Sequence, residues 1–193
     1  MPSRSLSDFA DLTETTLSSE RVLDGKMIRV NRDQVRLPDG SDAFREYVLH
    51  PGAVIIAVFV DDDTLIFEHQ FRYAVRRHFI ELPAGKIDVG EPHADTARRE
   101  LLEETGYTAL HWHHAATLHA GIGYSNEKIE LHVARHLTHV GHQRDAGEFL
   151  EVFTMSLDKA VEKVGRGEIT DTKSAFSLLW LDKFRNRLPG VST

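Results

Sequence analysis

The chain of 193 residues contains no cysteine. This absence excludes disulfide bonds, thiolate nucleophiles and every zinc or iron–sulfur site that depends on cysteine ligands. Positive charge is also in short supply, since 23 Lys and Arg residues stand against 30 Asp and Glu residues and the formal net charge is −7. Such a surface repels a polyanion, so we expect no nucleic-acid partner.

Long hydrophobic runs are missing as well. The longest strongly apolar run, residues 53–60 (AVIIAVFV), has about half the length that a membrane-spanning helix requires. We expect it to be a buried strand and expect no association with a membrane. The opening residues (MPSRSLSDFADLTE) lack the basic start and the apolar stretch of a secretory signal. We therefore expect a cytoplasmic protein.

The first seventy residues carry strand patterns. A hydrophobic content of 41% excludes disorder for the bulk of the chain. The length fits one domain of about 150 residues with additional residues at one end. Residues 25–37 and 43–50 flank a Pro-Asp-Gly turn at 38–40, which predicts a β-hairpin. Residues 53–60 and 64–72 flank an acidic turn and predict a second hairpin.

Helical patterns begin at Pro92, because proline suits the first turn of a helix. A helix is predicted over residues 92–105, with Gly106 as its stop. Three strands and two helices are then predicted, at residues 110–118, 128–136, 149–155, 157–164 and 172–187. In the last helix four apolar side chains recur at helical spacing and should pack in the core: Phe176, Leu179, Trp180 and Phe184. The order of elements predicts an α+β fold with a mixed sheet packed between helices.

Three carboxylates in the first predicted helix carry the clearest chemical signal. Glu100, Glu103 and Glu104 stand at positions i, i+3 and i+4, so they share one helix face and repel one another. Such a cluster alone is usually a solvated surface, but this one follows a Leu-Pro-Ala-Gly turn at 82–85 and ends at a glycine. A Mg²⁺ ion is the natural neutraliser, because it takes oxygen ligands and bridges to substrate phosphates.

The spacing around these carboxylates resembles that of a known family. From Gly85 the sequence runs five residues to Glu91, seven more to Arg99-Glu100, then Leu101, any residue, Glu103-Glu104, any residue and Gly106. This stretch matches the Nudix box at every fixed position. The one departure is the next residue, Tyr107, where the family usually has an aliphatic side chain, and it should affect packing rather than chemistry.

The resemblance extends over residues 19–181, to the subgroup of Nudix hydrolases that cleave ADP-ribose and related nucleoside diphosphate sugars. It is carried by EYVLHPGAV at 46–54, QFRY at 70–73, ELPAGK at 81–86 and EFLEV at 148–152. The chain departs from the subgroup after the box, where AGIGYSNE at 120–127 replaces a frequent Ser-Pro-Gly. The resemblance implies the α/β/α sandwich of the Nudix fold, with residues 51–193 as the hydrolase domain and residues 1–50 as an N-terminal antiparallel β extension.

The resemblance also implies the metal ligands. Glu100, Glu103, Glu104 and the carbonyl oxygen of Ala84 match the positions that hold Mg²⁺ in the family, and Mn²⁺ can substitute. Arg99 matches the arginine that pairs with the first glutamate of the box, here Glu91, and we interpret this pair as support for the site.

Substrate and base residues are implied outside the box. Glu148 matches the loop carboxylate that acts as general base, and Glu151 is its rival. Arg72, in QFR, matches an arginine that contacts the diphosphate or the terminal sugar, and its guanidinium suits phosphate. Arg45 is a further candidate for substrate binding from the N-terminal strands.

Histidine is frequent, with 12 residues, eight of them between positions 111 and 142. His111 with His113, and His139 with His142, form pairs that share a face. Zinc requires three or four convergent ligands, and neither pair has an evident third. We expect solvated or hydrogen-bonded histidines.

The predicted function is a Mg²⁺-dependent pyrophosphohydrolase acting on ADP-ribose or a related nucleotide sugar. The alternatives are a hydrolase of another nucleoside diphosphate linked to a group X, which would use the same box, and a non-catalytic nucleotide-sugar sensor. We further predict a homodimer that exchanges its N-terminal strands, residues 21–50, across a two-fold axis. A hairpin of two strands is only marginally stable alone, and the resembling subgroup typically exchanges this arm.

Overall fold

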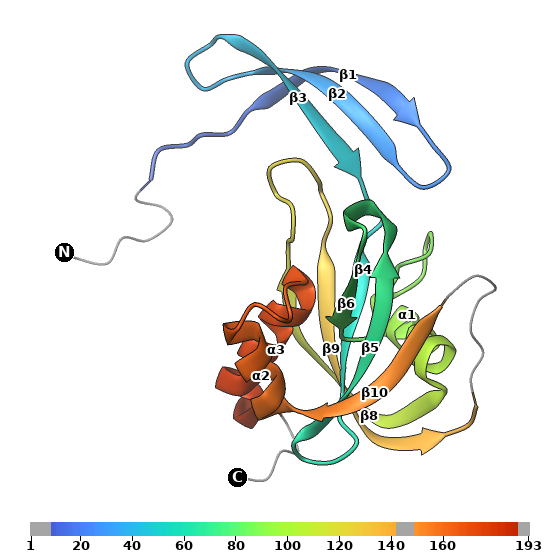
Figure 1. Cartoon of the computed structure of the whole chain (residues 1–193). Helices are drawn as coiled ribbons and strands as arrows, with labels where there is room; N and C mark the ends of the chain where they lie inside the picture. Colours follow the sequence, from blue (N-terminus) through green and yellow to red (C-terminus); the bar gives the residue numbers. More distant parts are fainter. Residues whose placement is uncertain (1–8, 142–148, 189–193) are drawn as a thin grey trace. The chain divides into compact units, whose positions relative to one another are not determined.

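A computed structural model of the chain describes residues 9–141 and 149–188. The coordinates divide into two compact units, one formed by the residues up to 50 together with 121–126, the other by the rest (Figure 1). None of the helices in these described ranges is both long enough and apolar enough to cross a membrane.

The N-terminal unit is an antiparallel sheet of three strands in the order β1-β2-β3. Strand β1 spans Thr15–Asp24, β2 spans Arg29–Arg36 and β3 spans Asp42–Leu49. Strands β2 and β3 form the predicted hairpin, whereas β1 was not predicted, because its ten residues are all exposed and show no apolar alternation. Polar pairs hold it instead, as where Arg21 Nε donates to Asn31 Oδ1 at 2.7 Å.

The loop at residues 121–126 belongs to this same unit. The Val48 N–H donates to the Tyr124 carbonyl at 2.8 Å, and the His50 N–H donates to Asn126 Oδ1 at 2.8 Å. This loop lies within the segment where the sequence departs from the resembling subgroup.

The second unit contains two sheets. The mixed sheet has four strands in the order β7-β4-β9-β8, at Ala84–Lys86, Ala53–Val58, Ile129–His139 and Tyr107–Leu118. Only its β4–β9 pair is parallel. The other sheet is antiparallel, in the order β10-β5-β6, at Leu150–Ser156, Thr64–Arg72 and Arg77–Glu81.

The predicted hairpin between residues 53–60 and 64–72 is therefore wrong. Strands β4 and β5 belong to different sheets and share only a bridge between Phe59 and Leu65. All six residues of β4 are buried, as expected of a strand that is covered on both faces and has a parallel neighbour. The short strands β6 and β7 were not predicted.

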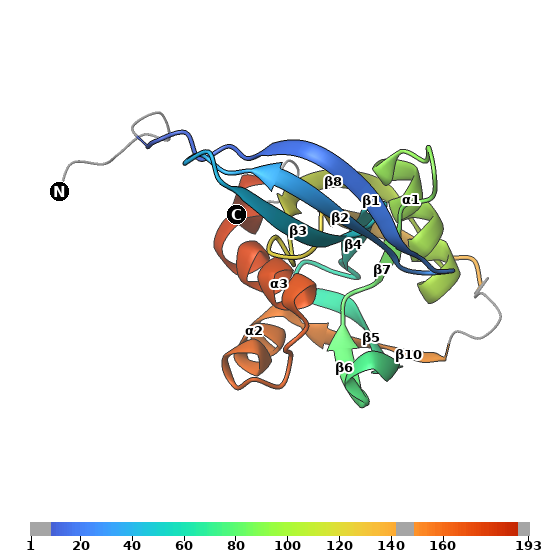
Figure 2. The same cartoon turned by 90° about the horizontal axis from the view of Figure 1, so that it is seen from above.

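Helices cover both faces of the mixed sheet. Helix α1 (His93–Glu100) lies on one side, and α2 (Leu157–Gly165) and α3 (Thr172–Phe184) lie on the other (Figures 1 and 2). Strand β4 alternates accordingly: Val54, Ile56 and Val58 pack with Ala97 and Leu101. This arrangement confirms the predicted α/β/α sandwich.

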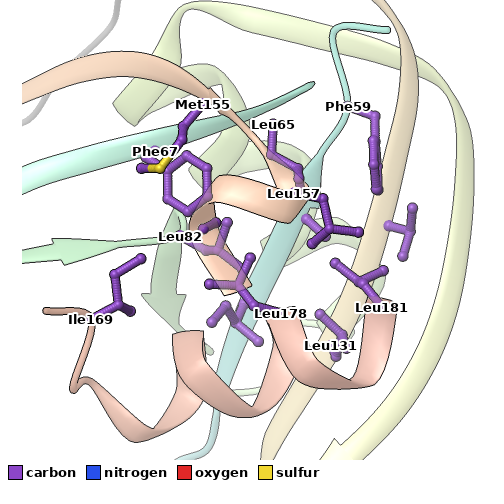
Figure 3. Close-up of a cluster of buried hydrophobic side chains, with 14 of the residues drawn as sticks. Phe59, Leu65, Phe67, Leu82, Leu131, Met155, Leu157, Ile169, Leu178 and Leu181 are labelled. Carbon is purple, nitrogen blue, oxygen red and sulfur yellow. The ribbon is translucent and has the colours of Figure 1, made fainter. Parts of the chain in front are cut away.

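The opposite face of the sheet forms the larger core, beneath α2 and α3. Ile55 and Ala57 of β4 share this cluster with apolar side chains from both sheets and both helices. Figure 3 shows Leu178 and Leu181 of α3 within it, beside Leu82 and Leu131.

The predicted apolar stripe of the last helix is only partly right, since Trp180 packs against the core but two of the other residues do not. Phe176 is 39% exposed and Leu179 is 48% exposed, whereas the buried face carries Ser174, Ser177, Leu178 and Leu181. Ser174 is buried because its hydroxyl accepts the Leu82 N–H at 2.9 Å. The buried face of the helix thus includes a small polar side chain with a backbone partner, which the hydrophobic pattern did not predict.

Candidate active site

A cavity of about 640 Å³ opens in the second unit, where β5, β7 and the helix of the predicted box meet. Its walls include residues from the end of β5 (Gln70, Phe71 and Arg72) and from the box (Ala84, Gly85, Lys86, Asp88, Arg99, Glu100 and Glu104). Phe149 and Leu150, at the start of β10, complete the lining. The cavity therefore gathers five of the nine residues that the sequence analysis assigned to the site, namely Arg72, Ala84, Arg99, Glu100 and Glu104.

The helix of the box is irregular where its carboxylates lie. The α-helix ends at Glu100 and continues as a single π turn over Leu101–Thr105, which Gly106 ends with a positive φ of 75°. The sequence predicted one regular helix over this stretch. A π turn often marks a functional site, and here it carries Glu103 and Glu104 immediately after Glu100.

The turn before the helix approaches these carboxylates closely. A Cβ added at Gly85 would lie 1.8 Å from the carboxyl carbon of Glu100, so this position requires glycine. The Ala84 N–H donates to Glu104 Oε2 at 3.0 Å. The close approach at Gly85 and the hydrogen bond from Ala84 place strand β7 against the helix. The Ala84 backbone therefore lies beside two of the predicted metal ligands, Glu100 and Glu104.

Arg99 contacts three of the four glutamates of the box. Its Nε and Nη2 donate to Glu91 at 3.1 and 3.0 Å, and its Nη1 donates to Glu100 at 2.8 Å and to Glu103 at 2.9 Å. Glu91 accepts hydrogen bonds from Arg99, from Thr96 and from the backbone of Asp88. These bonds, above all those from Arg99, lower the pKa of Glu91 to about 2. Arg99 therefore ties the loop of Glu91 to the helix and also offsets the charge of two predicted ligands.

Glu104 lies in a different electrostatic environment. Burial raises the pKa of its carboxyl group well above the usual range, and the nearby carboxylates of Glu68 and Glu100 add to the effect. Glu104 is only 5% exposed and Glu100 only 9% exposed. A divalent cation would stabilise the charged forms of both groups.

The residues present fit a hard divalent cation, because carboxylate and carbonyl oxygens are the ligands that Mg²⁺ prefers. No three His, Asp or Glu side chains among residues 9–141 and 149–188 are already arranged around a single metal position. At the box, Arg99 Nη1 binds one oxygen of Glu100 and one oxygen of Glu103.

Arg72 is held in the cavity wall by a buried partner. Its Nε and Nη2 donate to the two oxygens of Glu81 at 2.6 and 2.8 Å, and Lys173 of α3 also binds Glu81. Burial alone would raise the pKa of Glu81, but the hydrogen bonds from Arg72 and Lys173 outweigh it and the pKa is lowered. The sequence analysis missed Glu81 and Lys173 as site residues, although Glu81 begins the ELPAGK segment.

The remaining predicted site residues lie elsewhere. Arg45 is on β3 in the N-terminal unit, where its Nε donates to Glu14 at 2.8 Å. Glu148 lies outside the described residues, but Phe149 and Leu150, which follow it, line the cavity. Glu151 is an exposed residue of β10 and pairs in register with His69.

The histidines interact mainly with one another. His93 Nδ1 lies 2.8 Å from His132 Nε2, and His114 Nε2 lies 2.7 Å from Glu130 Oε2. Burial, together with His93 and His114, lowers the pKa of His132 to about 4. Of the pairs considered from the sequence, His111 packs beside the ring of His136, with centroids 4.5 Å apart, and His142 lies outside the described residues.

Comparison with known proteins places this geometry in a family. Residues 48–174 match the NUDIX domain, and residues 14–48 match the nucleoside diphosphate sugar hydrolase N-terminal domain. The N-terminal unit and the box are thus both covered by recognised domains.

Similar proteins are found over most of the chain. An ADP-ribose pyrophosphatase of Bacillus subtilis is 36% identical, over 88% of this chain and 93% of its own. A methanol dehydrogenase activator of Bacillus methanolicus is 31% identical, over 87% and 92% of the two chains. A crystal structure of an ADP compounds hydrolase has the same fold, with a TM-score of 0.82 and 22% identity, over 95% of this chain and 100% of its own.

The position of Glu104 leads to a first prediction. Glu104→Gln removes the charge of a predicted metal ligand in the cavity wall, and we expect kcat to fall at least about 100-fold, or about 2.7 kcal/mol in the activation barrier. Glu162→Gln, on the exposed surface of α2, is the matched control and should keep full activity. Steady-state kinetics at saturating Mg²⁺ give the measurement. Normal turnover by Glu104→Gln would show that this carboxylate is not a ligand.

Proposed function

The chain belongs to the Nudix hydrolase family, and we propose that it hydrolyses the diphosphate of ADP-ribose or a related nucleoside diphosphate sugar. Water attacks one phosphorus atom and the P–O–P linkage breaks, so the products are a nucleoside monophosphate and a sugar phosphate. The observation that carries the proposal is a single cavity with two buried box carboxylates, Glu100 and Glu104, on one side and a fixed arginine, Arg72, on another.

The acidic side of the cavity is the place for Mg²⁺ or Mn²⁺. Glu100, Glu103, Glu104 and the carbonyl oxygen of Ala84 would hold the cation. When bound, it neutralises the substrate phosphates and lowers the pKa of a coordinated water. Arg99 keeps the loop of Glu91 on the helix and so maintains the position of the glutamates.

The basic side of the cavity suits the diphosphate. Arg72 is held by Glu81 through two of its nitrogens, so its guanidinium has little freedom to lose when a phosphate oxygen approaches. Lys86 also lines the cavity. These residues would bind and orient the diphosphate while the carboxylate side activates water.

The choice of a nucleotide sugar rests on the comparisons. The match of residues 14–48 is to an N-terminal domain of nucleoside diphosphate sugar hydrolases, and the Bacillus subtilis relative is an ADP-ribose pyrophosphatase. A hydrolase of small nucleoside triphosphates needs no such N-terminal domain.

A product assay tests this function directly. The protein is incubated with Mg²⁺ and a panel of ADP-ribose, GDP-mannose, other nucleotide sugars and nucleoside triphosphates, and the products are separated by chromatography. We expect a nucleoside monophosphate and a sugar phosphate from at least one nucleotide sugar, and slower turnover of triphosphates. Preference for triphosphates would assign a different substrate class, and binding without products would indicate a sensor.

We assign the general base to Glu148, because the two residues that follow it line the cavity and its segment matches the subgroup. Glu148→Gln should lower kcat with little change in KM, as expected when an interaction matters only in the transition state. Glu151→Gln is the control. If Glu151→Gln shows this signature and Glu148→Gln does not, the roles of the two carboxylates are reversed.

We also propose that the protein is a homodimer whose N-terminal strands complete the partner's substrate site. A sheet of three strands with one fully exposed strand, β1, presents unpaired backbone groups and gains from a covering surface. Arg45, the candidate substrate residue of the N-terminal unit, is exposed on β3 and pairs there with Glu14.

Complementation distinguishes a shared site from a simple dimer. Sedimentation should give about twice the monomer mass of 21.8 kDa. If each site combines Arg45 of one subunit with Glu104 of the other, a mixture of the Arg45→Ala and Glu104→Gln proteins should recover activity, because each heterodimer has one intact site. A fully active monomer would contradict the dimer, and a mixture without recovery would contradict the shared site.

A further inference from the structure

A second cavity, of about 420 Å³, lies at the edge strand β8 of the mixed sheet. It shares no lining residue with the candidate active site, and its volume is in the range of small-molecule sites. Its walls come from β8, from the neighbouring strand β9 and from the residue after the last helical turn, and they include Leu110, His111, His113, Val133, Arg135 and Leu188.

The strand register places four of these side chains on one face. His111 pairs with Arg135, and His113 pairs with Val133. Directly opposed residues of an antiparallel pair lie on the same face of the sheet, as do residues two apart along a strand. Val133 belongs to the core beneath α2 and α3. Arg135 and the two histidines are therefore on the face of the mixed sheet that these helices cover.

Arg135 brings a cation into this cavity wall with much of its hydrogen-bonding capacity unused. Its guanidinium lies over the ring of Phe59, 4.2 Å from the centroid, and its side chain is 15% exposed. Nε and Nη2 are both buried, and neither has a hydrogen-bond partner in the part of the chain that the structure describes. Nη1 lies 3.6 Å from the exposed Asp62, too far for a hydrogen bond. Buried donors without an acceptor are costly and normally have a water or a bound group as partner.

The chemistry of the wall indicates what this partner is. Nε and Nη2 hold parallel N–H groups along one edge of the guanidinium, which is the arrangement that binds two oxygens of a carboxylate or a phosphate. Leu110, Val133 and Leu188 add apolar surface in the same cavity. The combination suits a molecule with an anionic group at one end and an apolar body at the other.

We propose that this cavity binds a small organic anion. Its carboxylate or phosphate group pairs with Nε and Nη2 of Arg135, and its apolar body contacts Leu110, Val133 and Leu188. The site is separate from the cavity to which we assign hydrolysis, so the inference does not depend on the proposed function.

Titrations followed by NMR test the proposal, with benzoate and phenyl phosphate as probes and benzamide as the uncharged counterpart of benzoate. The full chain, labelled with ¹⁵N and free of metal, is titrated at about millimolar probe concentrations, the range expected for ligands of this size. We expect saturable shifts of the backbone amides of residues 110–113 and 133–135 with at least one of the two anions. Benzamide should bind about tenfold or more weakly, because it lacks the charge that pairs with a guanidinium. The anion with the higher affinity identifies the acceptor group.

A pair of arginine variants tests the role of Arg135. Arg135→Lys keeps the positive charge but loses the paired N–H groups, so we expect the affinity for the anion to fall about tenfold or more. Arg77→Lys is the matched control. The Arg77 guanidinium also lies over a phenyl ring, that of Phe79, but its Nη2 already donates to Thr170 Oγ1 at 2.8 Å. This variant should leave the affinity unchanged.

A second pair of variants decides the matter if Arg135→Lys does not fold. Leu110 lines the cavity but is 76% exposed, so a polar residue at this position should not disturb the core. Leu110→Glu should bind the anion several-fold more weakly than Leu110→Gln at low ionic strength, because the two side chains differ in charge and salt would screen the repulsion.

Four results would overturn the proposal. They are the absence of saturable shifts with both anions, equal affinities for benzoate and benzamide, an unchanged affinity in Arg135→Lys, and equal affinities in the two Leu110 variants. Shifts confined to residues of the other cavity, such as Gln70 and Lys86, would also overturn it, because the anion would then bind at the candidate active site.

Discussion

The crowding of negative charge at the end of α1 is the constraint on which the rest of the site depends. Glu100 and Glu104 are almost fully buried, and Glu103 follows on the same turn. Carboxylates avoid such positions unless a cation compensates them. Arg99 provides part of that compensation, for Glu100 and Glu103, and burial raises the pKa of Glu104.

Several features of the fold follow from this crowding. Strand β7 must approach the helix closely enough for its backbone to bind Glu104, and only glycine at position 85 leaves room for Glu100. The same turn continues from Glu81, which fixes Arg72 and is itself fixed by Lys173 at the start of α3. The acidic and basic walls of the cavity are therefore connected through one short segment, 81–85, and a change in that segment would disturb both.

The sequence was most informative where spacing carries chemistry. The box indicated the helix, its glycine stop and the contact of Arg99 with Glu91, because these depend on neighbours along the chain. It was least informative where the burial of a side chain depends on contacts with residues distant in the sequence. The aromatic residues of α3 have helical spacing, yet the helix buries Ser174, whose hydroxyl accepts the Leu82 N–H, and Ser177, whose hydroxyl donates to the Lys173 carbonyl. Glu81 and Lys173 were missed as site residues for the same reason, because they meet from β6 and α3.

Arg99 binds the loop and the helix of the box with different nitrogens of one guanidinium. Its Nε and Nη2 donate to Glu91 of the loop, and its Nη1 donates to Glu100 and Glu103 of the helix. A cation held by Glu100 and Glu103 would leave the pair with Glu91 in place, because that pair uses Nε and Nη2 of the guanidinium. A lysine could not divide its contacts in this way, because its ammonium group lacks the fixed fork of the guanidinium.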